Sequence, residues 1–248
     1  MSGATNDGRT DDLFDLLQRA ANNALCGAVR GIGGAELDRI RGKEPHARAA
    51  RETILQAAPV WLKIDADSSR STFALASRAM DMDPDGALPV AVAAYNQARL
   101  FNGGKVESLD ATGRLAFDLS CRAAALDDGD PLVVTARAAA ATLLHAEQAG
   151  EEADALVDRA LAMDPTSGWA WERKAFLLCW DRPDEAIPCF NRALQPHGPH
   201  ILWDNCFMGI GQAHIAGDRM PEAIRWMRRA HIENPRAHLP VARLVCLE

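Results

Sequence analysis

Several residues of this chain have the types that catalytic sites use, but their spacing does not match the common motifs. Gly103-Gly104-Lys105 has the composition of a phosphate-binding loop. Such a loop also needs an earlier glycine and a Ser or Thr after the lysine to meet Mg²⁺, whereas this chain has Val106 there. Gly31-x-Gly33-Gly34 follows no predicted strand. It therefore indicates a helix break rather than a dinucleotide-binding turn.

One stretch holds residues of the types that bind zinc. His197 and His200 lie between Cys189 and Cys206. Structural zinc sites place their ligands at a few set spacings, and these four residues match none of them. Histidines that hydrogen-bond within a turn are the favoured interpretation. We predict no catalytic residue, no metal site and no cofactor in this chain.

Composition argues against several functional classes. The chain has 248 residues and a formal net charge of -7, which argues against general nucleic-acid binding. Met1 to Thr10 lacks the apolar stretch of a signal peptide, and no apolar run is long enough to cross a bilayer. We therefore predict a cytoplasmic protein without membrane contact, and the richness in arginine and alanine suggests a GC-rich bacterial source. In a reducing compartment the cysteines are expected to be small core residues: Cys26, Cys121, Cys179, Cys189, Cys206 and Cys246.

The elements that would position a site follow a period close to 34 residues. Pro131, Pro165 and Pro199 are each 34 residues apart, and Pro235 follows 36 residues later. A unit of this length that ends in proline is typical of the helix–turn–helix repeats of the tetratricopeptide class. The period predicts an all-α fold, a tetratricopeptide-like solenoid of stacked helix pairs that form an α-α superhelix.

Side-chain sizes inside the period support this fold. Two helices cross closely where side chains are small, and large apolar groups fill the space beside the crossing. Three copies of such a pattern align, each with a first-helix and a second-helix part: Phe207-x2-Ile210-Gly211 with Ala223-x3-Met227-x2-Ala230, Trp171-x2-Lys174-Ala175 with Ala186-x3-Phe190-x2-Ala193, and Ala141 and Leu144 with Ala153-x3-Val157-x2-Ala160. Because alanine is abundant, an ordinary all-α domain is the alternative. The spacing of proline, glycine and aromatic residues favours the repeat.

We divide the chain into two parts. Residues 1–45 are predicted to be a tail and linker helices, and residues 46–248 a repeat array. The array is expected to have four full helical pairs between about 46 and 235, and a cap helix, Ala237 to Leu247, over its exposed end. Predicted helices in its first half are Thr72 to Met82, Ala87 to Phe101 and Leu109 to Leu126. Predicted turns are Asn102-Gly103-Gly104, Ala149-Gly150-Glu151 and Ala216-Gly217-Asp218, the last two with a helix-ending glycine.

The concave side of such an array is lined by first-helix residues that point away from the second helix. We predict that a protein or peptide partner contacts the following residues: Thr142, His145, Trp169, Glu172, Phe176, Trp180, Asn205, Met208, Gln212 and Ile215. Phe176 and Trp180 would be costly to leave in water. They therefore indicate either a bound partner or packing against a neighbouring helix or the N-terminal segment.

Charged residues near helix ends have a simpler interpretation. The pairs Asp127-Asp128 and Glu151-Glu152 are expected to be solvated capping residues. Five arginines of the last unit are interpreted as a solvated face, with a docking site for an acidic partner as the alternative: Arg219, Arg225, Arg228, Arg229 and Arg236.

Further stretches resemble parts of a bacterial family. In that family a linker joins a regulatory module to a C-terminal tetratricopeptide array. Four stretches of this chain are similar to the linker: Asp11 to Leu17, Glu36 to Arg39, Pro45 and Trp61 to Lys63. Two more stretches resemble sequences typical of that array: Arg78 to Pro84 and Glu222 to Ala230. In the family the array follows a class III adenylate or guanylate cyclase domain or a DNA-binding winged-helix domain, and nothing in this chain matches either. The resemblance implies a sensory or scaffolding role.

We therefore predict a non-enzymatic module for signal transduction that binds a peptide or protein in a concave groove, with no nucleic acid contacted by this region. One alternative is the regulatory region of an adenylate or guanylate cyclase whose catalytic domain is not in this chain. A further alternative is a self-contained helical enzyme, which would be marked by a buried polar cluster.

Overall fold

The structure of the chain is a computed structural model. It describes residues 50, 53–54, 66–103, 106, 108–144, 149–194 and 203–235, all within the compact unit Glu44–Glu248. In these ranges helices alternate with turns, and no strand occurs. The helices are α3 (Ala66–Met82), α4 (Ala87–Gly103), α5 (Leu109–Leu126), α6 (Pro131–Leu144), α7 (Ala149–Met163), α8 (Gly168–Leu178), α9 (Pro183–Ala193), α10 (Trp203–Ala216) and α11 (Met220–Glu233). The all-α prediction is confirmed.

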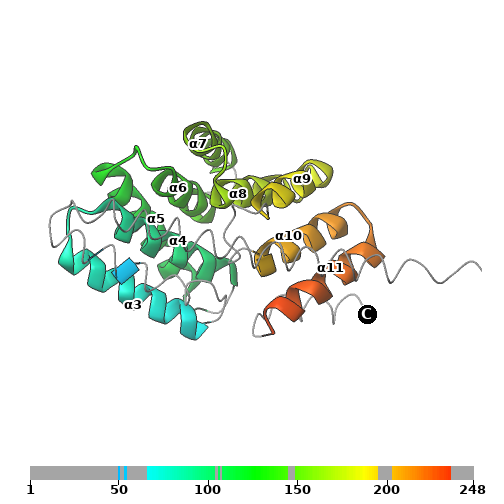
Figure 1. The fold of residues 1–248 in the computed structure, drawn as a ribbon, viewed down its shortest axis with the longest axis horizontal. Helices are drawn as coiled ribbons and strands as arrows, with labels where there is room; N and C mark the ends of the chain where they lie inside the picture. The colour runs from blue at the N-terminus through cyan, green and yellow to red at the C-terminus, as the bar shows by residue number, and fades with distance from the viewer. Residues whose placement is uncertain are drawn as a thin grey trace, which may run out of the picture. The chain divides into compact units, whose positions relative to one another are not determined.

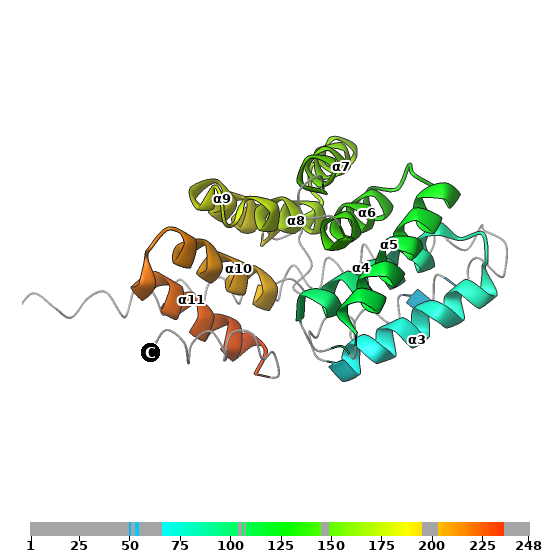
Figure 2. The ribbon, with the colours of Figure 1, turned by 180° about the vertical axis from the view of Figure 1, so that it is seen from behind.

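The helices pack as successive pairs. Within each pair the first helix lies against the second, as α4 does on α5, α6 on α7, α8 on α9 and α10 on α11. Figures 1 and 2 show each helix beside the one that follows it in the chain. The first helices also contact one another, α4 with α6, α6 with α8 and α8 with α10. This succession is the predicted arrangement of helical repeats, and between α4 and α11 it contains four complete pairs.

Some predictions concern residues that the structure does not describe. The tail and linker helices of residues 1–45, the cap helix from Ala237 to Leu247 and most of the segment before α3 lie outside the described ranges. The boundary at residue 45 and the cap therefore remain predictions.

Short turns lead into the first helices. In the turn before α4, the Gly86 N–H donates to the Asp83 carbonyl at 3.1 Å, and before α8 the Ser167 N–H donates to the Asp164 carbonyl at 3.1 Å. The Ser167 hydroxyl then accepts from the Ala170 N–H at 3.3 Å, which satisfies one of the free donors at the start of α8. The same backbone hydrogen bond, from an N–H to the carbonyl three residues earlier, therefore leads into two of the first helices, α4 and α8.

Small residues lie where the helices cross. Each of the helices α3, α5, α7, α9 and α11 has a fully buried alanine at the equivalent position: Ala79, Ala123, Ala160, Ala193 and Ala230. On α10 a methyl group added at Gly209 would overlap the ring of Phe190 on α9. Ala160, Ala193 and Ala230 are small positions of the predicted pattern, which on α10 named Gly211 rather than Gly209.

Two glycine predictions need correction. Gly150 does not end a helix, because it lies in the first turn of α7, which begins at Ala149 and carries Glu151 and Glu152 at its amino end. Carboxylates are favourable there, next to the partial positive charge of the helix terminus. Asn102 and Gly103 likewise belong to the last turn of α4 rather than to a turn after it.

The turn after α10 also differs in detail from the prediction. It lies at Gly217, as expected, but the residue with a positive φ is Asp218, at 56°. Aspartate tolerates this left-handed region better than most residues that have a side chain. The turn can therefore reverse the chain without placing glycine at the left-handed position.

The described cysteines lie mainly in the core. Cys179 and Cys206 are fully buried, Cys189 is nearly so, and Cys121 is half-buried. Cys26 and Cys246 lie outside the described residues. None of the helices described is both long enough and apolar enough to cross a membrane.

Candidate functional site

Buried polar side chains concentrate on the first helices. Among the described residues, every buried charged or amide side chain lies on α4, α8 or α10: Asn96, Gln97, Arg99, Glu172, Arg173, Asp204, Asn205 and Gln212. The second helices bury mainly alanine and other apolar residues instead. Buried polar groups are costly unless they find partners, so this asymmetry identifies the first helices as the part of the array with a specific polar arrangement.

Glu172 is the centre of this arrangement. Its side chain is fully buried on α8. The Tyr95 hydroxyl on α4 donates to Oε2 at 2.5 Å, and the Asn205 amide on α10 donates to Oε1. Burial and the neighbouring Glu172 carboxylate raise the pKa of Tyr95, so the phenol keeps its proton and remains a donor. The carboxylate thereby joins three first helices, and the Tyr95 and Glu172 positions are 77 residues apart.

Asp204 is a second buried carboxylate, on α10. Burial raises its pKa, while a hydrogen bond from the Asn234 amide, at 2.7 Å, and the charge of Arg99 oppose the shift. Its other oxygen accepts from the Asn205 backbone N–H at 2.9 Å. Arg99 and Arg173 supply positive charge near the Tyr95 hydroxyl. The cluster therefore contains two guanidinium groups and two carboxyl groups.

Three of the predicted partner-binding residues come together in this cluster. Trp169 is half-buried and packs edge-on against Tyr95, with 5.2 Å between the ring centroids. Glu172 and Asn205 are hydrogen-bonded as described above. Gln212 is also buried on α10, 6 % exposed.

Other predicted residues pack in the apolar core. Phe176 meets Phe190 of α9 edge-on, with 5.0 Å between the ring centroids. It also packs, as Ile215 does, against the cluster that Met208 forms with Met227 and its neighbours. For Phe176 the structure thus shows the packing against a neighbouring helix that was one of the two alternatives.

The remaining predicted residues are more scattered. Trp180 lies in the turn beyond the end of α8 and is 57 % exposed. Thr142 is half-buried on α6, and its hydroxyl donates to the Ala139 carbonyl of the same helix at 2.9 Å. His145 lies outside the described residues.

Sequence reasoning missed four members of the cluster. They are Tyr95, Arg99, Arg173 and Asp204. Tyr95 is the chain's one tyrosine, in a segment of small apolar residues, and that isolation was an available signal. The unit that begins with α4 is longer than its neighbours, so its inner residues could not be assigned from the register of the later units.

The cluster supplies hydrogen-bond donors and acceptors rather than a nucleophile. Burial raises the pKa of the Cys206 thiol well above its usual range, and nearby carboxylates act in the same direction. Tyr95 is likewise held protonated. No group of three His, Cys, Asp or Glu side chains in the described part of the chain could hold a metal ion. His197 and His200 lie outside it.

The arginines of the last unit have different environments. Arg219 pairs with Asp184 at 2.9 Å, and its Nε donates to His214 Nδ1 at 2.9 Å. Arg229 lies over the ring of Phe207, 4.9 Å from the centroid. Arg225 and Arg228 are exposed, and Arg236 lies outside the described residues. The set is therefore dispersed among several local contacts.

Comparison with known proteins identifies the class of fold. No protein-family model matches the sequence, and no curated protein matches it. Solved structures do match. A tetratricopeptide-repeat protein of Thermus thermophilus, TTC0263, superposes with a TM-score of 0.59 over 80 % of this chain and 98 % of its own, at 12 % identity. The likeness, together with the paired helices, establishes a tetratricopeptide-like fold.

Two larger proteins share the fold over part of their length. The Cut9–Hcn1 assembly of APC/C matches with a TM-score of 0.57 at 13 % identity, over 73 % of this chain and 33 % of that one. Human IFIT1, in a dimer with PPP-AAAA, matches with a TM-score of 0.59 at 15 % identity, over 74 % of this chain and 43 % of that one. At these identities the likeness concerns the fold.

Proposed function

We propose that this chain is a non-enzymatic binding module that receives a peptide or protein segment along its first helices, α4, α6, α8 and α10. The observation that carries the proposal is the confinement of the buried charged and amide side chains to α4, α8 and α10. Helix packing alone does not require this asymmetry, since the second helices pack through alanine and other apolar side chains. We call the side of the array formed by the first helices the inner face. A bound segment has backbone donors and acceptors of its own, so it would need polar groups on this face.

The predicted partner-binding residues fall into two groups under this proposal. Trp169, Asn205 and Gln212 provide polar and aromatic contacts, while Glu172, whose oxygens are both occupied inside the array, supports them together with Phe176, Met208 and Ile215. Thr142, on α6, and His145, which lies outside the described residues, remain predicted contacts of the preceding unit. A segment held along about three units would bury an interface at the low end of the standard range, which corresponds to roughly micromolar affinity.

The experiment is a selection of random displayed peptides on the full chain, followed by fluorescence polarisation of the selected peptides. Arg173→Ala and Gln212→Ala alter the inner face, and Arg225→Ala is the matched control on an exposed face. We expect the two inner-face variants to weaken binding at least about tenfold, with the control unchanged. Circular dichroism melting verifies that each variant is folded. Selected peptides that bind all four proteins equally would contradict the proposal.

The enzyme alternative was to be marked by a buried polar cluster, and such a cluster is present. Its geometry nevertheless favours binding. Both Glu172 oxygens accept hydrogen bonds from inside the array, and Tyr95 and Cys206 are held in their protonated forms. A catalytic base or nucleophile needs a free lone pair directed at a substrate. We therefore propose a structural and recognition role for the cluster.

We further propose that the module is the regulatory part of a cytoplasmic bacterial signalling protein, with a cyclase polypeptide as the alternative. The support is the resemblance of Arg78 to Pro84 and of Glu222 to Ala230 to sequence stretches typical of that family's repeat array; the first stretch lies at the end of α3 and in the turn after it, and the second lies on α11. An immunoblot of the endogenous protein tests the proposal. A polypeptide much larger than 26.8 kDa is expected, and one of that mass would contradict an attached catalytic or DNA-binding domain.

A further inference from the structure

A second surface lies at the edge of the array, where the turns that follow α8 and α10 are side by side. Trp180, in the first turn, is 57 % exposed, and Met220, just after the second, is 37 % exposed. A tryptophan so exposed is unusual, because this side chain is buried on average and contributes strongly where it meets a partner. This edge is separate from the polar cluster on the first helices.

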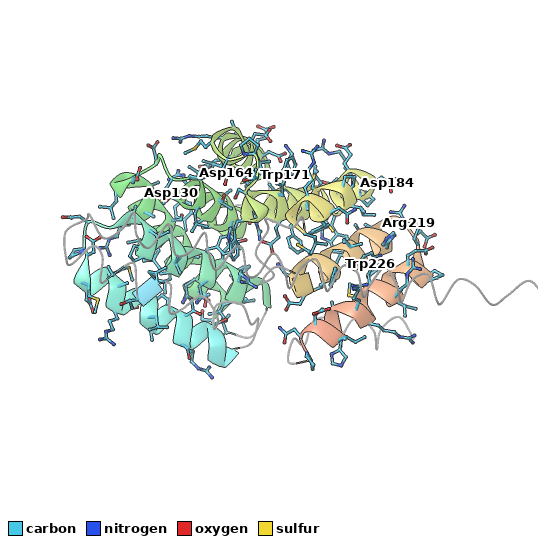
Figure 3. All side chains as sticks on the ribbon, viewed as in Figure 1. Asp130, Asp164, Trp171, Asp184, Arg219 and Trp226 are labelled. Carbon is cyan, nitrogen blue, oxygen red and sulfur yellow. The ribbon has the colours of Figure 1, made fainter. Side chains whose placement is uncertain are left out.

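The two turns are fixed to each other by Arg219. Its guanidinium pairs with Asp184, near the start of α9, at 2.9 Å, and its Nε donates to His214 Nδ1 at 2.9 Å. Figure 3 shows Asp184 and Arg219 close together at the ends of α9 and α11. The ion pair is partly exposed, so its contribution is positional more than energetic.

Each turn also has a backbone hydrogen bond of its own. In the first turn the Arg182 N–H donates to the Leu178 carbonyl at 2.8 Å. In the second the Arg219 N–H donates to the His214 carbonyl at 2.8 Å, and Asp218 takes a left-handed conformation with φ of 56°. A surface built in this way loses little conformational entropy when a partner binds, which favours affinity.

The charge of this edge identifies its partner. Asp181, Asp184, Glu185 and Asp218 are exposed carboxylates around the apolar side chains. Of the basic groups there, Arg182 and Arg219 already pair with Glu185 and Asp184 respectively, and the charge of Arg225 near His214 is opposed by that of Glu222. No basic side chain among the described residues forms an ion pair with Asp181 or Asp218. The edge therefore has an excess of negative charge beside an exposed indole.

We propose that this edge, formed by Trp180, Met220, Asp181 and Asp218, is a docking site for a basic protein segment that carries a large apolar side chain. The apolar side chain contacts Trp180 and Met220. Lysine or arginine on either side pairs with Asp181 and Asp218. The inference goes beyond the proposed function, because it needs no ligand on the first helices.

The test uses three fluorescein-labelled peptides with a central leucine, flanked by lysine, by glutamate or by glutamine. Fluorescence polarisation with the full chain should show binding of the lysine peptide alone, weakening as salt is added. Trp180→Ala should raise its Kd at least about tenfold. Asp218→Asn keeps a residue that tolerates the left-handed conformation while removing the charge, so it should weaken binding and reduce the salt dependence.

The control variants separate this site from other surfaces. Ile232→Ala removes another exposed apolar side chain, 70 % exposed near the far end of α11, and should leave the Kd unchanged. Arg173→Ala alters the inner face and should also leave it unchanged. The inference is overturned when the lysine peptide binds no better than the glutamate peptide, or when Trp180→Ala and Ile232→Ala have equal effects. Neither result would affect the proposal for the first helices.

Discussion

Gly209 shows how much a single residue can determine in this array. A methyl group at this position would overlap the Phe190 ring, so Gly209→Ala forces α9 and α10 apart. We expect a loss of about 1–3 kcal/mol in the free energy of unfolding, the range for overpacked cores. Urea denaturation followed by circular dichroism measures it.

Gly150 provides the matched control for that substitution. It lies in the first turn of α7 with no atom close enough to contact an added methyl group. Gly150→Ala should therefore stabilise the protein by about 0.4–1 kcal/mol, because alanine has less backbone freedom to lose. Equal destabilisation by both substitutions would show that the Gly209 approach is not as close as described.

His214 makes the stability of the last unit depend on pH. Burial lowers its pKa first of all, and the charges of Arg219 and Arg225 add to this, with Glu222 and Asp184 opposing. The unfolded chain therefore takes up the proton more readily than the folded chain. Stability is complete above the ordinary histidine pKa of about 6.5 and falls as the pH decreases through the lowered value.

The melting temperature should therefore decrease between about pH 7 and pH 5, and His214→Gln should reduce this decrease. Glutamine can still accept the hydrogen bond from Arg219 Nε but does not titrate in this range. Differential scanning calorimetry of both proteins across the range measures the difference. Parallel pH profiles would show that His214 is not the group responsible.

At the scale of the element, an Arg–Ala pair recurs on every second helix described. The alanine is the crossing residue, and on α5, α7, α9 and α11 the arginine before it contacts its own unit. Arg122 donates to the Pro84 carbonyl at 3.1 Å, and Arg159 to the Asp128 carbonyl at 2.9 Å. Arg192 and Arg229 instead lie over aromatic rings of α8 and α10. The arginine thus ties each of these second helices to its first helix or to the turn before it.

The contact of Arg192 with Trp171 allows a quantitative test. The guanidinium carbon is 4.4 Å from the ring centroid, and the indole N–H donates to the Pro165 carbonyl at 2.8 Å. A double-mutant cycle with Arg192→Ala and Trp171→Leu should give a coupling energy of about 0.5–1 kcal/mol, as for exposed cation–π pairs. Arg225→Ala, on an exposed position of α11, should not change the unfolding midpoint. A coupling near zero would mean that the ring and the cation act independently.

At the scale of the whole molecule, the period of the sequence predicted the succession of helices but not the contacts between distant units. The repeat positions of Pro, Gly, Ala and aromatic residues are local signals, so the helix Leu109–Leu126 and the second-helix segment from Ala223 to Ala230 could be placed from them. Glu172 was correctly assigned to a first helix. Its burial and its hydrogen bond to Tyr95 depend on how units stack, and a local pattern contains no information about that.

The Glu172 hydrogen bonds should make the described array unfold as one unit. Solenoids are stabilised by nearest-neighbour contacts, and their units can separate in stability. Here the carboxylate links α4 directly to α8 and α10. Tyr95→Phe removes one donor and leaves the buried carboxylate with an unmet acceptor, at an expected cost of about 1–3 kcal/mol in the free energy of unfolding.

Because that cost falls on the contact between units, the Tyr95→Phe variant should also show reduced cooperativity. We expect α10 and α11 to lose hydrogen-exchange protection at a different denaturant concentration from α4 and α5. Thr142→Ala removes a hydroxyl whose bond stays within α6, so it should lower the midpoint without dividing the transition. A single transition in the Tyr95→Phe protein, with uniform exchange across α4 to α11, would show that contacts between adjacent pairs suffice to hold the array together.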